Sequence, residues 1–412
     1  MDRRRPGHHP AGTGVRLSSH RRRLARDPPR IGQGQRRKAI VTFACAVLSA
    51  AMRSSLFLTL FLGAAAVQGQ QPRVAVPSDP ITLIVEALRT HSVVAFSDPH
   101  GHPELQAFEL AVVRDTRVRS VIDDIVVESG NARFQAVMDR YIGGEAVPYE
   151  ELHHVWHDTT QTQNIGPKDG TVPELYRVVR DLNASATPPL RKLRVLLGDP
   201  PVDWSVVRTA QDHRKWIEQR ELHAAAVIER EVLARHHHAL VVYGEQHLQR
   251  RNLAANYSTE GLAATVGSGI EKAAPGQLFS LWWLTDEKAP PAEVANWPSP
   301  SAALVRGTTL GMLDYTAFQE SPPTRATIIN GEIVPLPRSE WRNLRMEEQF
   351  DAVLKIDKVT AVPQTPPTRS FDVCADRDWV TEWIRRLTLP SGPSGGGPVS
   401  PTVQRLRNQC GL

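Results

Sequence analysis

Short apolar runs alternate along the chain with segments whose apolar residues recur at helical spacing. The runs have the length of buried strands, and the intervening segments repeat apolar residues every three or four positions. We expect strands at residues 91–96, 125–127, 193–197, 239–243 and 278–284, with weaker ones at 303–306 and 352–356. Helices are expected at residues 103–114, 132–142 and 220–235. This alternation predicts an α/β fold with a mainly parallel central sheet and helices on both faces.

The same pattern divides the chain into four segments. Residues 1–51 form a basic prefix without domain character, and we expect the working start at Met52. Residues 52–69 are predicted to be a signal peptide, 70–386 one α/β domain, and 387–412 a Gly/Pro linker and tail. Within the domain, the polar segment 143–168 is expected to form a helix-and-loop cap over one end of the sheet.

The predicted signal peptide has the three parts that a signal peptidase substrate needs. Arg53 supplies a positive charge, an apolar core follows, and the small residues Val67 and Gly69 precede the expected cut. The apolar run is shorter than the roughly 20 residues of a membrane-spanning helix. We therefore expect export to the periplasm or the extracellular space, with no stable membrane span after cleavage. A longer twin-arginine-like leader that starts at Met1 is the alternative.

The net charge of the chain changes sign when the basic prefix is left out of the count. The whole chain has a net charge of +5, but residues 1–51 hold 12 of its 49 basic and only 2 of its 44 acidic residues. With Arg53 also removed, 36 basic and 42 acidic residues remain, a net charge of −6 for residues 70–412. This acidic balance argues against a nucleic-acid partner. Cys374 and Cys410 remain of the three cysteines and form a candidate disulfide in an oxidising compartment.

Titratable side chains follow four of the predicted strands directly. Asp98 and His100 follow the first strand, Glu128 ends the second, Asp199 follows the third, and Glu245 and His247 follow the fourth. The carboxyl ends of parallel strands share one edge of a sheet, where loops converge on a ligand. Strand ends also border polar loops for structural reasons alone. Two histidine turns with a glutamate between them favour a functional cluster of Asp98, His100, Glu128 and His247.

This cluster admits two kinds of chemistry. His100, His247 and Glu128 could hold a divalent metal ion with an open position for water. Alternatively, an imidazole oriented by a carboxylate could act as a general base without a metal. Asp199, Arg140 and Glu245 are candidates for orienting the base or holding a substrate group.

Other sequence motifs give weaker evidence for a functional site. His153 and His157 are four residues apart, but they lie in the polar cap segment. The match to G-x-S-x-G at residues 392–396 lies in the linker, without a strand before it or a helix after it. Residues 70–412 contain no H-E-x-x-H, no phosphate-binding loop and no G-x-G-x-x-G.

The strand-end motifs resemble those of the superfamily that joins erythromycin esterases, ChaN-type haem-binding lipoproteins and Tiki-type metalloproteases. The turn G-E-Q-H at residues 244–247 matches its G-x-x-H turn, and Glu128 matches its glutamate at the end of the second strand. The first turn departs from the G-E-x-H pattern, because Ser97 and Asp98 replace the glycine and glutamate. The chain is most similar to an exported bacterial branch that carries N-A-R-F-Q at 131–135, D-R-Y at 139–141 and L-L-G-D-P-P-V-D-W at 196–204.

The resemblance covers roughly residues 85–360 and implies function only broadly, because such relatives hydrolyse esters, cut peptides or bind haem. The leading hypothesis is an exported hydrolase of ester or amide bonds, acting on a small molecule or a peptide, in which the strand-end cleft activates water. The alternative is a haem- or metal-binding protein without turnover. The altered first turn also favours, to a lesser degree, a fold retained without activity.

Overall fold

The computed structural model describes residues 71–98, 102–161, 171–251, 265–284, 291–315, 326–329, 332–335, 344–357, 374, 377–389 and 401–412. The chain divides into two units, residues 1–70 and 71–412, and every described residue belongs to the second. The expected prefix, the expected signal peptide and His100 therefore lie outside the described residues.

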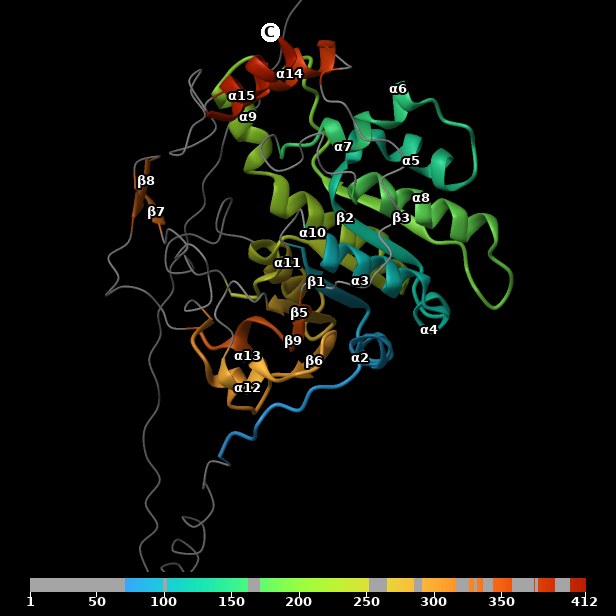
Figure 1. Cartoon of the computed structure of the whole chain (residues 1–412), viewed down its shortest axis with the longest axis vertical. Coiled ribbons are helices and arrows are strands. Elements are labelled where there is room, and N and C mark those ends of the chain that lie inside the picture. Colours follow the sequence, from blue (N-terminus) through green and yellow to red (C-terminus); the bar gives the residue numbers. More distant parts are fainter. Residues whose placement is uncertain are drawn as a thin grey trace, which may run out of the picture. The chain divides into compact units, whose positions relative to one another are not determined.

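A seven-stranded sheet forms the centre of the described unit (Figure 1), in the order β3-β2-β4-β1-β5-β9-β6. The first six strands in this order are parallel to their neighbours, and the edge strand β6 runs antiparallel to β9. The strands are β1 (Val93–Ser97), β2 (Asp124–Asn131), β3 (Arg194–Asp199), β4 (Ala239–Tyr243), β5 (Leu278–Leu284), β6 (Ser301–Leu304) and β9 (Ala352–Lys355). All residues of β1, β2, β4 and β5 are buried, which explains the apolar runs in these strands, although β2 also buries polar side chains such as Asp124 and Glu128.

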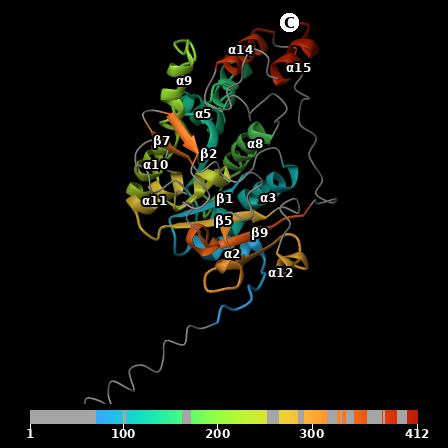
Figure 2. The ribbon, with the colours of Figure 1, turned by 90° about the vertical axis from the view of Figure 1, so that its left-hand side faces the viewer.

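Helices cover both faces of this sheet. They are α2 (Pro80–Leu88), α3 (Pro103–Arg114), α4 (Thr116–Arg119), α5 (Gln135–Ile142), α6 (Tyr149–Leu152), α7 (His154–His157), α8 (Thr171–Ala184), α9 (Ala210–Ile217), α10 (Arg220–Glu231), α11 (Val266–Ala273), α12 (Ala292–Ala295), α13 (Met346–Gln349), α14 (Arg377–Thr388) and α15 (Pro401–Cys410). One apolar core joins the sheet to α2, α3, α5 and α8, and a second joins its other face to α10 and α11 (Figures 1 and 2). The predicted fold class is thus confirmed.

Local sequence explains where several helices begin. The side chain of Asp79 accepts a hydrogen bond from the Thr82 amide at 2.7 Å, and Pro80 opens α2. Thr209 and Asp212 form a capping box at the start of α9. These caps lie in short polar stretches before weak apolar patterns, and the periodicity alone did not predict α2, α8 or α9.

Two predicted helices are interrupted. The segment expected as one helix at 132–142 begins with a 3-10 turn, η1 (Ala132–Phe134), before α5. The helix expected at 220–235 ends as α10 at Glu231 and continues as a second 3-10 turn, η2 (Leu233–Arg235). His236 then takes a left-handed conformation with φ of 56°, which ends the helical path. The cap expected at 143–168 contains α6 and α7, and its residues 162–168 lie outside the described residues.

The observed limits of β2 and β6 also differ from the predicted limits. The strand β2 continues past residue 127 through Glu128 to Asn131, with a register shift against β3 between Val127 and Asn131. The antiparallel edge strand β6 occupies residues 301–304 instead of 303–306. A hairpin of β7 (Ala326–Ile329) and β8 (Glu332–Pro335) forms a separate two-stranded sheet.

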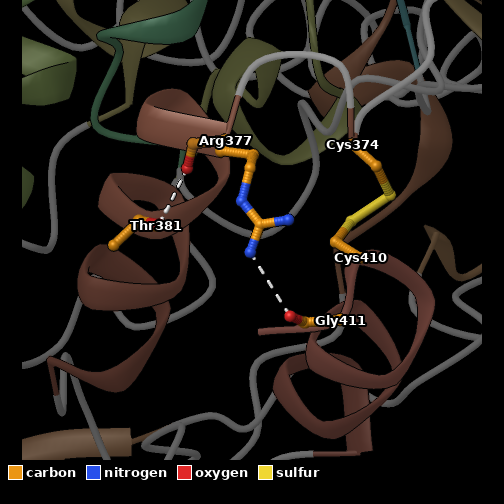
Figure 3. The surroundings of a disulfide bond; sticks show 5 residues. All are labelled: Cys374, Arg377, Thr381, Cys410 and Gly411. Atoms are coloured by element: carbon orange, nitrogen blue, oxygen red, sulfur yellow. Dashed lines mark hydrogen bonds between the residues drawn. A yellow bond between two sulfur atoms is a disulfide. The ribbon is translucent and has the colours of Figure 1, made fainter.

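The C-terminal segment is helical rather than an irregular tail. The domain boundary expected after residue 386 falls within α14, and α15 occupies residues 401–410. A disulfide joins Cys374 to Cys410, and the Arg377 guanidinium donates to the Gly411 carbonyl at 3.3 Å (Figure 3). Apolar residues of both helices, including Trp379, Trp383, Val403 and Leu406, form their own small core. In the described part of the chain, no helix has the length and apolar character needed to cross a membrane.

Candidate active site at the carboxyl ends of the strands

The carboxyl ends of four adjacent strands bring the predicted side chains to one edge of the sheet. The order β3-β2-β4-β1 places Asp199, Glu128, the turn after β4 and Asp98 on neighbouring strands. The amide of Asp98 donates to the Tyr243 carbonyl at 2.8 Å, which fixes the turn after β1 against the end of β4. His100 follows in the same turn and lies outside the described residues.

Glu128 is the centre of the arrangement and is only 4% exposed. Its Oε2 accepts a hydrogen bond from the Gly244 amide at 2.6 Å. Its Oε1 lies 3.1 Å from Arg220 Nη2 and 3.1 Å from His247 Nε2, and also accepts from the Gln161 side-chain amide. A buried carboxylate is stable only when donors and positive charges replace its hydration, and four donors do so here.

Gly244 makes the approach of Glu128 to His247 possible. A Cβ at this position would lie 3.2 Å from Glu128 Oε2 and 3.2 Å from His247 Cδ2. His247 itself lies in a short 3-10 turn, η3 (Glu245–Leu248), directly after β4. The G-x-x-H sequence therefore supplies both the main-chain donor to Glu128 and the imidazole beside it.

His247 lies between two carboxylates. Its Nε2 faces Glu128 and its Nδ1 donates to Glu221 Oε1. Burial by itself disfavours the imidazolium, but Glu128 and Glu221 outweigh it and raise the pKa of His247 to about 10. Each ring nitrogen thus faces a carboxylate, which favours the imidazolium that donates a hydrogen bond from both nitrogens.

Glu221 was not predicted from the sequence. It lies in the first turn of α10, where its Oε2 accepts from the Val266 amide at 3.0 Å, at the start of α11. The strand-end rule did not single it out, because its position depends on how α10 packs against α11 and the end of β4.

Asp199 belongs to the same network through Arg220. Arg220 Nε lies 3.8 Å from Asp199 Oδ1, while the amide and hydroxyl of Thr160 donate to the two oxygens of this carboxylate. Burial raises the pKa of Asp199 to about 7, against the opposing effects of Arg220 and Thr160. The carboxyl end of the sheet thus contains a carboxyl group, that of Asp199, which changes its charge near neutral pH.

A tightly held loop supplies Thr160 and Gln161. The Asn131 side chain donates to the carbonyls of Asp158 and Val202 at 2.6 and 2.9 Å, and the indole of Trp204 donates to the Asp158 carbonyl at 3.0 Å. Asn131 and Trp204 come from the motifs at 131–135 and 196–204, so these motifs serve to position the loop.

A pocket opens on the other side of Glu128, toward α3 and α8. Its polar lining comes from five side chains: Asp98, His102, Gln106, Glu109 and Glu128, beside Ser129. The imidazole of His102 packs edge-on against Trp283, with ring centres 4.7 Å apart. His102 was not predicted as a site residue, although the sequence His100-Gly101-His102 places a second imidazole near Asp98.

The other candidates have different partners. The Arg140 guanidinium bonds to Glu145 and Glu151, each at 2.6 Å, on the surface of α5. Glu245 accepts from the Tyr315 hydroxyl at 2.5 Å. His157 is buried and stacks on Trp379, with ring centres 4.3 Å apart, and burial lowers its pKa to about 3. Arg140 and Glu245 thus bond to groups other than Glu128.

The predicted metal ligands His100, His247 and Glu128 stay a prediction, because His100 lies outside the described residues. Among the described residues, Arg220 and His247 both contact Glu128. In the ranges that the structure describes, no three histidine, cysteine or acidic side chains converge in a way that could hold a metal ion.

Comparison with known proteins gives similarity in structure only. No family profile matches the chain, and no curated protein matches it. A succinoglycan biosynthesis protein has 12% identity and a TM-score of 0.46, over 69% of this chain and 94% of its own. A mutant of the erythromycin esterase EreC in its open conformation has 11% identity and a TM-score of 0.39, over 68% and 95%. ChaN of Campylobacter jejuni, described with cofacial haem binding, has 8% identity and a TM-score of 0.30, over 50% and 86%.

At this level of identity and TM-score, the similarity supports no conclusion about the site or the reaction.

Proposed function

We propose that the chain is an exported hydrolase in which the pocket beside Glu128, about 40 Å³ in volume, holds the attacking water, and an ester or amide bond is cleaved at its mouth. The observation that carries this proposal is the pocket lining, which gathers a carboxylate and an imidazole from the turn after β1, Asp98 and His102, around Glu128. The substrate is a small molecule or a peptide, and its carbonyl carbon is attacked by water.

In this mechanism the base belongs to the turn at residues 98–102. Asp98 and His102 line the pocket, and His100 lies between them in the sequence. The base takes a proton from water as the oxygen bonds to the carbonyl carbon, and that proton passes to the departing alcohol or amine. Glu128, held by its four donors, orients the water or the protonated base. His247 serves as a fixed positive charge behind Glu128 and not as the base.

The test combines a substrate screen with three matched variants. Wild-type protein should hydrolyse at least one member of a panel of esters and amides. Glu128→Gln should lower kcat/KM about 100-fold or more, and His100→Ala or His102→Ala should do the same if that residue is the base. His91→Ala is the control, because residue 91 precedes β1 at the opposite edge of the sheet.

The outcomes separate the two functional classes. Loss of activity in Glu128→Gln with an unchanged melting temperature supports the hydrolase. Full activity of Glu128→Gln, or equal loss in His91→Ala, contradicts the proposed site. Purified protein with a Soret absorbance band and no hydrolysis would favour the haem-binding alternative instead.

A further inference from the structure

The helix α14 is bound to the loops that follow β3 and α7. The Arg385 guanidinium donates to the Val207 and Trp204 carbonyls at 2.9 and 3.3 Å. Arg386 Nη1 donates to the His157 carbonyl at 3.0 Å and lies 2.8 Å from Asp158 Oδ1. The C-terminal helices therefore contribute side chains to the surroundings of the loop that holds Thr160 and Gln161.

Arg386 is buried where α14 contacts these two loops. Its side chain is 5% exposed, and its guanidinium carbon lies 4.5 Å from the ring centre of Trp204 and 5.0 Å from that of Trp379. Cation–π contacts with Trp204 and Trp379, together with ion pairs to Asp158 and Glu382, hold the guanidinium in place. A rigid, partly desolvated cation of this kind can bind an anion without much loss of conformational entropy.

A cavity of about 270 Å³ lies beside Arg386, at the low end of the size range of small-molecule sites. Four arginines and three acids line it: Arg133, Arg208, Arg385, Arg386, Asp158, Asp203 and Glu382. Positive charge is therefore in excess, although residues 70–412 as a whole are acidic.

Two of these arginines have guanidinium N–H groups that no contact with the described residues uses. Arg133 forms an ion pair with Asp203 at 3.1 Å through one terminal nitrogen, and its side chain is 51% exposed. The Arg208 guanidinium has no hydrogen bond or ion pair with any described residue. Guanidinium groups bind carboxylates and phosphates through two parallel hydrogen bonds. The indole of Trp204 and the ring of Phe134 supply apolar walls.

We infer that this cavity is a second binding site, distinct from the pocket beside Glu128, which takes the anionic group of a small molecule. The group is a carboxylate or a phosphate, held by Arg133 and Arg208 against the fixed charge of Arg386. Glu382, Arg385 and Arg386 of α14 line the cavity, so this C-terminal helix is part of the site.

Calorimetric titration of the full-chain protein with inorganic phosphate and with succinate, at constant ionic strength, tests the inference. We expect saturable binding of at least one of them, and the preferred anion identifies the chemical group. Arg133→Gln or Arg208→Gln should weaken that binding about tenfold, the usual effect of losing hydrogen bonds to a charged group.

Arg117→Gln is the matched control. Arg117 has the same 51% exposure as Arg133 and also pairs with an aspartate, Asp115, but it lies outside the cavity. Absence of saturable binding of both anions would overturn the inference. So would wild-type affinity in both cavity variants, or an equal loss in Arg117→Gln, which would indicate only unspecific charge attraction.

Discussion

At the scale of single residues, the protonation of His247 decides what the site can do. An imidazole between two carboxylates stays charged at neutral pH, so His247 supports Glu128 by its charge and its N–H groups. In the proposed hydrolase the base therefore comes from the turn after β1, where Asp98 and His102 line the pocket. Asp199, whose pKa burial raises to about 7, is a further group at this end of the sheet that changes its charge near neutral pH.

Substitution of Glu221 should lower the pKa of His247. In Glu221→Gln one of the two carboxylates that raise this pKa is lost, so the value should fall measurably below about 10. The change can be followed by NMR titration of the His247 ring proton. Glu229→Gln, an exposed substitution on the same helix, should leave the titration unchanged.

The same pKa shift has a consequence for stability. A pKa raised from 6.5 to about 10 means that His247 contributes its full stabilisation below about pH 6.5 and loses it as the pH rises to about 10. The free energy of unfolding of the wild type should therefore decrease across this range, and the decrease should be smaller in Glu221→Gln. An equal slope in both proteins would show that His247 is not the titrating group.

Close packing between strands also depends on individual residues. A Cβ on Gly198 of β3 would lie 1.7 Å from the Tyr243 hydroxyl and 3.0 Å from the Val127 carbonyl. We expect Gly198→Ala to reduce the free energy of unfolding by about 1–3 kcal/mol, the usual cost of overpacking. Denaturant unfolding measures this cost. Part of it should be recovered in the double variant with Tyr243→Phe, which removes the clashing oxygen. No recovery would point to the remaining contacts, the ring carbon of residue 243 at 2.9 Å and the Val127 carbonyl at 3.0 Å.

At the scale of elements, the sequence predicted strands better than the parts that surround the site. Asp98, Glu128, Asp199 and His247 follow from the rule that polar side chains at the ends of parallel strands share an edge. Glu221 and Arg220 belong to the start of a helix, so their place depends on tertiary packing that hydrophobic periodicity does not contain. The loop with Thr160 and Gln161 is held by Asn131 and Trp204, and such long-range hydrogen bonds leave no local pattern.

The disulfide between Cys374 and Cys410 closes a loop of 36 residues around the C-terminal helices. A loop of this length contributes about 3 to 4 kcal/mol in the chain-entropy model. Cys410→Ser should therefore loosen α14 and α15, whose apolar contacts form a core of their own, and should expose the segment after residue 374 to proteases. Limited proteolysis of the wild type, with and without reductant, checks this. Intact-mass measurement showing two free thiols in protein from an oxidising compartment would contradict the pairing.

At the scale of the whole molecule, the sequence predicts that the first 69 residues are not part of the working protein. Cleavage after Gly69 would remove the basic prefix together with the apolar segment and leave a mature protein that begins at or near Gln70. N-terminal sequencing of the exported protein tests this. Retention of residues 1–51 in that protein would show that the segment at 52–69 is not a cleaved signal.

The strand order also bears on how the chain folds during synthesis. The strand β4 lies between β1 and β2 but follows both in the sequence, so the middle of the sheet is incomplete until residue 243 has been made. Until then β2 can pair with β3, but β1 lacks both of its neighbours, β4 and β5. A late central strand thus delays completion of the sheet until more than half of the polypeptide exists. This delay would suit the proposed export, because a translocation channel passes unfolded chains. Nascent chains released before residue 239 should remain protease-sensitive, whereas chains that extend past β9 should become resistant.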